Sequence, residues 1–315
     1  MKKSGLCAVI ICLIITIAIV AGVIVRRDND KAGDRSEAKK TEEVNIDDST
    51  VVSYLGPQGT YTEETCKLFF DNRGTYEPYE TVDEAVQALV DGKSTYAVIP
   101  QENTIGGAVI DYVDTLINQK SVSVVGEVEL PISQNLLVLP GTKLEDIKTV
   151  YSHKQGIAQG KAWLEKNLPD AEVIEVSSTA EGAKMVSEGQ DKSLAAIASI
   201  GCVEVYGLEA LAEGIQENDN NVTRFYVLST EEPETEDADR IAFVATGEAY
   251  DLPELMTEIN AAGMNLVALH DRPQKTELGH YNYLIECSDA SYSDFETISE
   301  NKKFEFRYLG SFYAE

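Results

Sequence analysis

The sequence predicts an α/β protein with two α/β lobes around a cleft, followed by a smaller ferredoxin-like βαββαβ module. The first observation is that short, β-rich apolar runs alternate with helical patterns from Val51 to Ser229, which is the order of βαβ units with a parallel sheet. Second, this alternation occurs twice, over 51–128 and again over roughly 130–210. Third, strand, helix, strand, strand, helix and strand patterns follow after residue 239.

The N-terminus predicts a transmembrane helix. Residues 5–25 are 21 residues without a charge, which span about 31 Å as a helix. A secretory signal has a shorter apolar region and a small-x-small cleavage site, whereas Arg26 and Arg27 follow here. We therefore expect a single-pass anchor in the cell membrane over residues 1–27 and a flexible tether over 28–50. The six basic residues after the span favour a cytoplasmic location for the rest of the chain. A short basic N-terminus is also typical of a signal-anchor, which would place the rest of the chain outside the cytoplasm.

The first lobe begins with the apolar run VVSYL and ends before residue 131. A helix is predicted over 81–92 because Val82, Ala85, Val86 and Leu89 recur on one helical face. By the same criteria the predicted strands are 51–55, 96–100 and 122–130, and the predicted helices are 60–70, 81–92 and 107–117.

The second lobe and the C-terminal module continue the pattern. Between them, 230–239 carries six acidic residues in ten and one proline, which is typical of a linker between domains. The strands predicted before the linker are 149–152, 171–177, 194–199 and 222–229, and the helices are 157–167 and 179–189. After it the predicted strands are 240–246, 264–273, 280–288 and 303–312, and the helices are 252–263 and 291–301.

Composition excludes several classes of function. The 26 Lys and Arg residues against 54 Asp and Glu give a net charge of −28, which argues against nucleic acid as a partner. The five cysteines include no CxxC pair, and the three histidines have no companion at metal-ligand spacing. No GxSxG, HExxH or P-loop motif occurs. We therefore expect no metal and no cofactor.

Four polar segments lie at or directly after the ends of apolar strands. Residues that bind a ligand in the cleft are expected at these positions. In the first, GPQGTY, Thr60 is a predicted helix N-cap, compatible with an anion site at the same helix terminus. In the second, PQENTIGG, Asn103 and Thr104 could bind a ligand, although capping of the next helix is the favoured interpretation.

The other two segments lie later in the chain. In YSHKQGIAQG, Ser152 ends a strand, and Gln155 and Gln159 are four residues apart on one helix face. In NVTRFYVLS, the strand period of two places Thr223 on the opposite face from Arg224. An arginine within an apolar strand requires an anionic partner.

Taken together, these segments resemble the prephenate dehydratase family. YLGPQGTYTEE, YAVIPQENTIGGAVIDYVDTL, YSHKQGIAQGKAWL and NVTRFYVL occur in the family's order, and Thr-Arg-Phe is its signature. The resemblance covers Val51 to Ser229, and the C-terminal region resembles an ACT domain. It implies a catalytic domain over 51–229, a linker over 230–239 and an ACT regulatory domain over 240–315. The implied reaction is conversion of prephenate to phenylpyruvate, with loss of CO2 and water, in phenylalanine biosynthesis.

The resemblance also implies roles for single residues. It identifies Thr223 as catalytic, and we interpret its hydroxyl as a hydrogen-bond donor to the leaving oxygen in a dry cleft. Arg224 is expected either to bind a substrate carboxylate or to form a structural ion pair. The expected substrate-binding residues are Asn103, Ser152 and Gln159, with weaker correspondence at Thr60, Thr104, Gln155 and Thr179.

The sequence departs from the family where an amino-acid effector is expected to bind the ACT domain. The family's Gly-Ala-Leu is replaced here by Tyr250-Asp251-Leu252, although Arg272 and Pro273 of its Glu-Ser-Arg-Pro motif remain. We therefore predict weak or absent phenylalanine inhibition, in a homodimer or homotetramer formed by paired ACT domains. The complete effector region is Tyr250, Asp251, Leu252, Asn265, Leu266, Arg272 and Pro273.

Two alternative functions stay open. Arogenate dehydratase performs the same chemistry on the amino analogue of prephenate. A non-catalytic protein that binds a small anion is the second alternative, because two α/β lobes around a cleft are also the periplasmic-binding-protein-like architecture of solute receptors.

Overall fold

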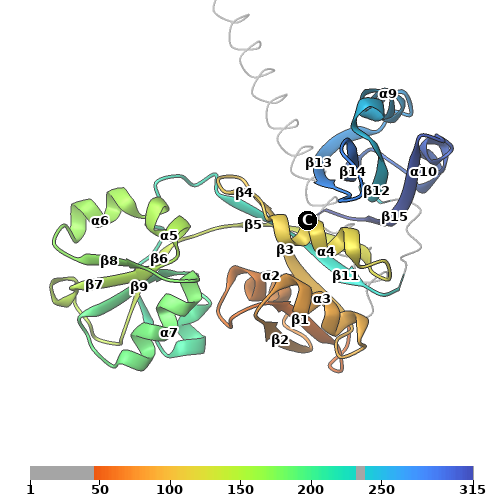
Figure 1. Cartoon of the computed structure of the whole chain (residues 1–315). Coiled ribbons are helices and arrows are strands. Elements are labelled where there is room, and N and C mark those ends of the chain that lie inside the picture. The colour runs from red at the N-terminus through yellow and green to blue at the C-terminus, as the bar shows by residue number, and fades with distance from the viewer. Residues whose placement is uncertain (1–45, 232–237, 315) are drawn as a thin grey trace, which may run out of the picture. The chain divides into compact units, whose positions relative to one another are not determined.

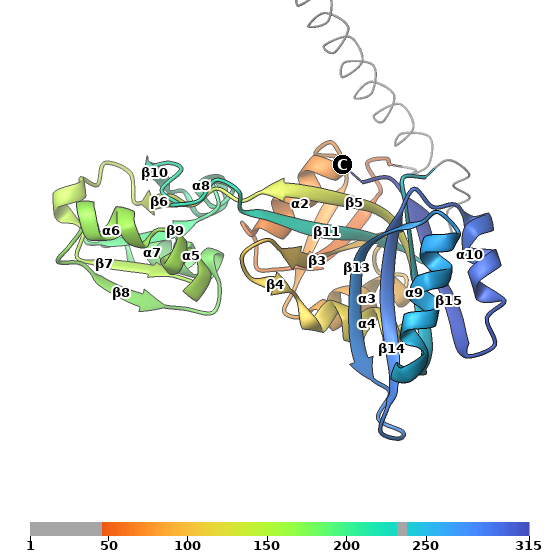
Figure 2. The same cartoon turned by 90° about the horizontal axis from the view of Figure 1, so that it is seen from above.

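The computed structural model describes residues 46–231 and 238–314 (Figures 1 and 2). The predicted membrane anchor over 1–27 and most of the predicted tether lie outside these residues. Among the helices in the described ranges, none combines the length and the apolar character needed to cross a bilayer.

The first lobe is a mixed sheet. Its order is β2-β1-β3-β11-β5, with the short β4 beside β3. β1 is parallel to β2 and to β3, whereas β11 is antiparallel to both β3 and β5. The strands are β1 (Val51–Leu55), β2 (Thr75–Tyr79), β3 (Tyr96–Asn103), β4 (Gly107–Ala108), β5 (Ser123–Pro131) and β11 (Val222–Ser229), and the helices are α2 (Tyr61–Phe69), α3 (Val82–Val90) and α4 (Ile110–Asn118).

The second lobe has its own mixed sheet, in the order β10-β6-β9-β7-β8. β7 is parallel to β8 and β9, and β6 is antiparallel to β9 and β10. Its strands are β6 (Asn135–Val138), β7 (Thr149–Ser152), β8 (Glu172–Glu175), β9 (Leu194–Ala198) and β10 (Glu209–Ala212). Its helices are η1 (Leu144–Asp146), α5 (Lys154–Gln159), α6 (Lys161–Asn167), α7 (Thr179–Gly189) and α8 (Cys202–Tyr206).

Three predictions about these lobes need correction. Neither sheet is wholly parallel, because β11 returns from the second lobe and inserts between β3 and β5 of the first. The single helix predicted over 157–167 is two helices in the structure. The first, α5, begins at Lys154, and the second, α6, follows it after Gly160. A Cβ at Gly160 would lie only 3.0 Å from Ile197 Cδ1, so the backbone packs closely on the sheet there. Five elements were not predicted because they are short or, like the TYEPY sequence of β2, mostly polar. These are the strands β2, β4, β6 and β10 and the helix α8.

The C-terminal module has the predicted βαββαβ order, and its antiparallel sheet runs β13-β14-β12-β15. One face packs on its two helices through a core that includes Phe243, Ile285 and Phe295. The elements are β12 (Arg240–Glu248), η2 (Ala249–Asp251), α9 (Leu252–Ala261), β13 (Asn265–Pro273), β14 (His280–Ser288), α10 (Tyr292–Ser299) and β15 (Phe304–Phe312).

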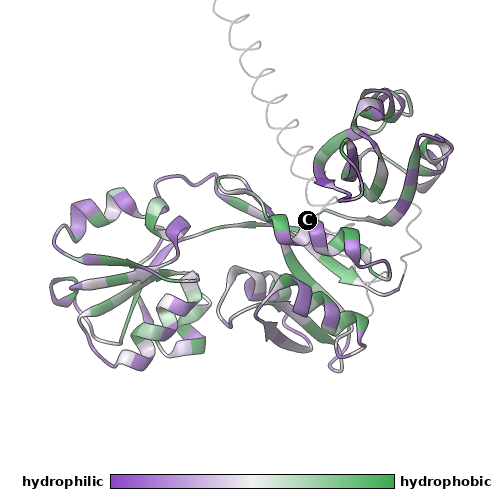
Figure 3. Ribbon diagram, in the orientation of Figure 1, coloured by the Kyte–Doolittle hydropathy of each residue, from purple (hydrophilic) through white to green (hydrophobic). Residues whose placement is uncertain are grey.

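The other face of this sheet shares a buried core with the first lobe. Val244 and Leu284 of the module belong to the same apolar cluster as Tyr112 and Tyr226 of the first lobe. Figure 3 shows hydrophobic stretches along β3 and β11, while the helices alternate between hydrophobic and hydrophilic residues. The alternation fits helices that bury one face against a sheet.

Candidate functional site

A cavity of about 320 Å³ is lined by residues of both lobes. The first lobe contributes the start of α2, the C-terminal end of β3 and the N-terminal end of β11. The second lobe contributes α5 and the start of α7. The polar side chains in its lining belong to Thr60, Tyr61, Thr62, Asn103, Gln134, His153, Gln155, Gln159, Ser177, Ser178, Thr179, Asn221 and Thr223.

Three helix N-caps lie in this lining. Thr60 Oγ1 accepts from the Glu63 N–H (3.4 Å) at the start of α2, as predicted. His153 Nδ1 accepts from the Gln155 N–H (3.3 Å) at α5, and Ser178 Oγ accepts from the Glu181 N–H (3.0 Å) at α7. Helix N-termini carry partial positive charge and unpaired N–H groups. Among the described residues no Lys, Arg, Asp or Glu side chain lines the cavity, so these termini and its polar side chains are the groups that it presents to an anion.

Asn103 and Thr223 form a hydrogen-bonded pair at the first-lobe wall of the cavity. Asn103 Nδ2 donates to Thr223 Oγ1 (2.9 Å) and to Asn221 Oδ1 (2.7 Å). Asn103 Oδ1 accepts from the N–H groups of Ile105 (3.0 Å) and Gly106 (2.8 Å), which fixes the orientation of the amide. Because the Thr223 oxygen accepts from Asn103, its own proton is free to be donated to a ligand.

A chain of amides continues from this pair into the second lobe. Gln159 Oε1 accepts from Asn221 Nδ2 (3.0 Å) and from Gln134 Nε2 (2.8 Å). Gln134 is 2% exposed, and its Oε1 has no hydrogen-bond partner among the described residues. The sequence analysis missed Gln134 and Asn221, although Asn221 directly precedes the strand that carries Thr223.

Strand geometry explains which side chains enter the cavity. Thr223 and Phe225 both line it, whereas Arg224 points to the opposite face of the sheet, as the period of two predicted. On the neighbouring strand β3, Pro100 and Asn103 line the cavity although they are three residues apart. The register explains this spacing, because Arg224 pairs with Glu102 and Phe225 with Pro100, which leaves Gln101 as the extra residue of a β-bulge.

Six predicted binding residues meet in the lining: Thr60, Asn103, Gln155, Gln159, Thr179 and Thr223. The remaining three, Thr104, Ser152 and Arg224, do not line it. Thr104 is exposed and bonds the backbone of Asn220 (2.9 Å) and Val222 (3.0 Å). The expected capping of the next helix is also wrong, because α4 begins at Ile110 with Val109 as its N-cap.

Ser152 is fully buried beneath the cavity. Its hydroxyl donates to the Ile197 carbonyl of the neighbouring strand (2.7 Å). A Cβ at Gly156 would lie 2.5 Å from Ser152 Oγ, so the backbone of α5 covers this hydroxyl. Ser152 therefore supports the start of α5, and direct contact with a ligand does not fit its position.

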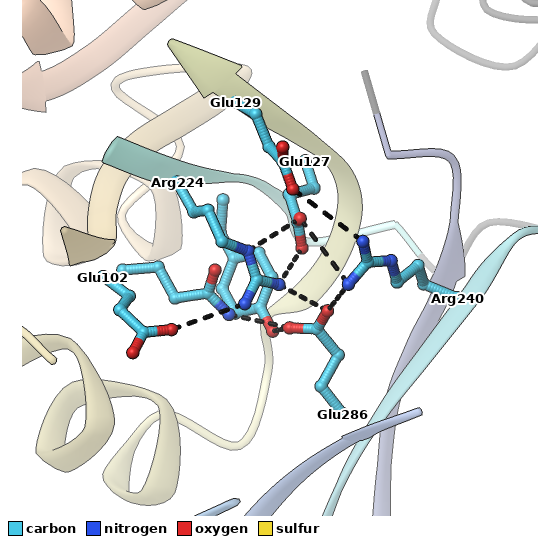
Figure 4. Close-up of polar contacts among 8 residues, drawn as sticks. Glu102, Glu127, Glu129, Arg224, Arg240 and Glu286 are labelled. Carbon is cyan, nitrogen blue, oxygen red and sulfur yellow. Dashed lines mark hydrogen bonds and ion pairs between the residues drawn. The ribbon is translucent and has the colours of Figure 1, made fainter. Parts of the chain in front are cut away.

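Arg224 takes part in an interdomain ion network, which we define as Glu127, Arg224, Arg240 and Glu286 (Figure 4). Arg224 binds Glu127 through two parallel hydrogen bonds, Nε to Oε1 (2.9 Å) and Nη2 to Oε2 (2.7 Å). Of the two interpretations in the sequence analysis, the structural ion pair is correct. The binding of a substrate carboxylate by Arg224 does not fit, because its guanidinium faces away from the cavity.

The Glu127 carboxylate gives a testable dependence of stability on pH. Burial raises the pKa of Glu127 to about 7, above the ordinary value of 4.5, although hydrogen bonding to Arg224 opposes this shift. Between about pH 4.5 and 7 the folded state therefore binds more protons than the unfolded chain, and this group's contribution to the free energy of unfolding falls as the pH rises. We expect Glu127→Gln to become more stable relative to the wild type between about pH 5 and 8, measured by urea denaturation.

Glu129→Gln is the matched control for this prediction. Glu129 lies on the same strand, but its side chain is 48% exposed and its carboxylate is 3.9 Å from Arg240. Its substitution should change stability little at either pH. Equal pH dependence in Glu127→Gln and the wild type would contradict the assignment of Glu127.

No metal site is evident in the described part of the chain, since no three His, Cys, Asp or Glu side chains there are grouped to hold an ion.

The predicted effector residues are in the C-terminal module, on η2, at the start of α9 and on β13. Tyr250 is 88% exposed, and Asp251 Oδ1 is 3.0 Å from Lys303 Nζ. Arg272 forms two hydrogen bonds with Asp114 of α4 (2.5 and 2.7 Å).

The fold and the cavity define a two-lobed α/β protein with a cleft lined by apolar and uncharged polar side chains and by helix N-termini, joined to a βαββαβ module. Comparison with known proteins narrows this class. The sequence model of the family "Prephenate dehydratase" matches residues 52–233. The chain therefore belongs to the prephenate dehydratase family.

Individual relatives agree with this assignment. The chain is 35% identical over 237 residues to the bifunctional chorismate mutase/prephenate dehydratase of Neisseria gonorrhoeae, which covers 75% of this chain and 65% of that protein. It thus spans just under two thirds of the length of this relative. It is 33% identical over 252 residues to the prephenate dehydratase of Corynebacterium glutamicum, over 77% of this chain and 79% of that one.

A solved structure is also similar. The prephenate dehydratase of Arthrobacter aurescens, described in complex with L-Phe, superimposes with a TM-score of 0.74 at 29% identity. The similarity covers 84% of this chain and 90% of that one.

Proposed function

We propose that this chain converts prephenate to phenylpyruvate, CO2 and water, as a hydro-lyase of phenylalanine biosynthesis. The observation that carries the proposal is the Asn103–Thr223 hydrogen bond at the wall of the cavity. The membership of the family supports the choice of substrate.

The proposed reaction breaks two bonds that join the substrate ring to its substituents. The bond from the ring to its carboxylate breaks and releases CO2, and its electron pair enters the ring. The ring carbon opposite loses its hydroxyl with the electron pair of that bond, and one proton is taken up to form water. Because the ring becomes aromatic, the driving force lies in the substrate, and the protein has to bind it and stabilise charge on the departing oxygen.

Thr223 is proposed to stabilise that oxygen. Its proton is free because Asn103 Nδ2 donates to its oxygen, and the orientation of Asn103 is held by two backbone N–H groups. A donor whose orientation is already fixed needs no reorganisation as charge develops. Asn103 is thus a partner that sets the direction of the Thr223 hydroxyl.

The two carboxylates of the substrate are proposed to bind near the helix N-termini capped by Thr60, His153 and Ser178. Gln155, Gln159 and Thr179 are further donors in the lining. Gln134 Oε1, which has no hydrogen-bond partner in the described part of the chain, is the proposed acceptor for a hydroxyl of the substrate. No metal or cofactor has a part in this proposal.

The test is an assay of the purified full chain with prephenate and with arogenate. Formation of phenylpyruvate from prephenate supports the proposal. Turnover of arogenate alone would show an arogenate dehydratase, and binding of prephenate without turnover would show a non-catalytic binding protein. A reaction without the protein measures the spontaneous breakdown of prephenate.

We also propose the domain organisation and localisation that the sequence predicts. Residues 51–229 are proposed as the catalytic domain, 230–239 as a linker and 240–315 as an ACT regulatory domain. Residues 1–27 are proposed as a single-pass membrane anchor, on the basis of their 21 uncharged residues. Recovery of the full chain in the membrane fraction after a carbonate wash tests the anchor.

Phenylalanine is expected to bind this chain weakly and to inhibit it little, in a dimer or a larger even oligomer. Tyr250 and Asp251 replace small residues of the family motif, and the Asp251 carboxylate adds negative charge although Lys303 partly offsets it. Restoring the small pair with Tyr250→Gly and Asp251→Ala should tighten phenylalanine binding by at least about tenfold in isothermal titration.

Leu278→Ala, at a fully exposed position in the same module, is the control and should bind phenylalanine like the wild type. Tight binding and strong inhibition in the wild type would show that the substituted motif still forms an effector site.

A further inference from the structure

Glu286 of β14 is a buried carboxylate that the C-terminal module presents to the first lobe. Its side chain is 1% exposed. Its Oε1 accepts from Arg224 Nη2 (2.5 Å) and Arg240 Nη1 (2.6 Å), and its Oε2 accepts from Tyr226 Oη (2.5 Å) and Gln101 Nε2 (2.7 Å). Three of these four donors belong to the strands β3 and β11 of the first lobe, so one carboxylate bonds both strands that carry the Asn103–Thr223 pair (Figure 4).

The bulge in β3 depends on the side chains that this network binds. In a regular strand Asn103 would share a face with Gln101 and point away from the cavity. Here Gln101 bonds Glu286, and the next residue, Glu102, lies 3.6 Å from Arg224 Nη1, so two consecutive side chains face the interdomain ion network. The alternation is thereby shifted by one residue, and Asn103 enters the cavity beside Thr223.

The second strand is held in the same way. Arg224 and Tyr226 flank Phe225 on β11, and both donate to Glu286 from the face opposite the cavity. Thr223 and Phe225 line the cavity on the other face. The Glu286 carboxylate therefore bonds side chains of both strands on the face opposite the cavity, next to the residues that pair Thr223 with Asn103.

We propose that Glu286 is a positioning residue for the proposed reaction: it holds the β3 bulge through Gln101 and the β11 strand through Arg224, and thereby keeps Asn103 and Thr223 within hydrogen-bond distance. This inference rests on the proposed function. Burial opposes ionisation of Glu286, but the charges of Arg224 and Arg240 and the hydrogen bonds from Tyr226 and Gln101 lower its pKa.

The test uses Glu286→Gln in the full chain, which keeps the shape of the side chain and removes its charge. We expect kcat for prephenate to fall at least about tenfold while KM changes by less than about threefold, because the effect is on the reacting hydroxyl rather than on carboxylate binding. In a Thr223→Ala background the same substitution should lower kcat by less than about threefold, since the group that Glu286 positions is already absent. Thermal denaturation of each variant establishes that it is folded at the assay temperature.

Asp114→Asn is the matched control. The Arg272–Asp114 pair also joins the module to the first lobe, with bonds of 2.5 and 2.7 Å, but these bonds run between β13 and α4 rather than to β3 or β11. Its loss should change kcat by less than about twofold. If Glu286→Gln does not fold, Gln101→Met tests the inference instead, because it removes one hydrogen bond to Glu286 without removing a charge. We expect Gln101→Met to lower kcat severalfold.

Two outcomes would overturn the inference. One is a folded Glu286→Gln with the kcat of the wild type. The other is an equal loss in the wild-type and Thr223→Ala backgrounds, which is the result of a general structural role. Failure of the proposed function is distinguishable, because it appears as a wild-type chain that does not convert prephenate or as a Thr223→Ala variant with an unchanged rate.

Discussion

Replacement of Thr223 by alanine is expected to lower kcat for prephenate by about 10²–10³-fold, the loss typical of removing one preorganised donor to a developing charge on oxygen. The variant should bind substrate nearly as well as the wild type, because the helix N-termini that are proposed to bind the carboxylates are unchanged. Its fold should be intact, since Phe225 and Val227 of the same strand stay buried. Steady-state kinetics of phenylpyruvate formation measure both parameters.

Thr223→Ser should retain appreciable activity, because the donor is preserved. Thr257→Ala serves as a control for loss of a threonine hydroxyl, since Thr257 is exposed on α9 and its hydroxyl donates to the Pro253 carbonyl (2.8 Å). Turnover of prephenate by Thr223→Ala at the rate of the wild type would refute the role of Thr223.

Arg224→Met is expected to lower the free energy of unfolding by about 3–5 kcal/mol near neutral pH, the cost typical of removing one partner of a buried ion pair. The substitution keeps an apolar stem in place but leaves the carboxylates of Glu127 and Glu286 without the guanidinium that bonds both. The loss should be smaller near about pH 5 than near about pH 8, because protonation of Glu127 removes one of the unpaired charges. Urea denaturation at both pH values measures the difference.

Lys161→Met is the control for loss of a basic side chain in an exposed ion pair. The two side chains of the Lys161–Glu165 pair are each 68% exposed, at a distance of 3.7 Å, so the expected change is within about 0.5 kcal/mol. Equal stabilities of Arg224→Met and the wild type would show that the interdomain ion network contributes nothing to the fold.

Local patterns in the sequence predict most elements of this protein. The strand over 51–55, the helix over 179–189 and the βαββαβ order of the C-terminal module are confirmed, because each is specified by its own periodicity and caps. The same holds for the alternation of Thr223 and Arg224 on β11, which requires only the period of a strand. Six of the nine residues expected in the site meet in one cavity, and all of them except Gln159, the last residue of α5, lie close to a strand end or a helix start.

Strand pairing over long separations was not predictable. The sequence places 222–229 at the end of the second lobe, yet β11 pairs with β3 and β5, whose residues are about a hundred positions earlier. The hydrophobic pattern of a strand indicates that it is buried but does not identify its neighbour. The all-parallel sheets expected from the element order were wrong for this reason.

By itself, the sequence determined the family, the order of the elements and the motif residues Asn103 and Thr223, because each depends on residues close together in the chain. Only the tertiary structure decided that Ser152 lies beneath the cavity, that a bulge at Gln101 turns Asn103 into it, and that Arg224 binds a carboxylate 62 residues away. The physical reason is that an ion pair or a bulge depends on which strands become neighbours and in which register. Glu286 and Arg224 each require a buried partner of opposite charge, but that partner is identified only once the C-terminal module packs on the first lobe.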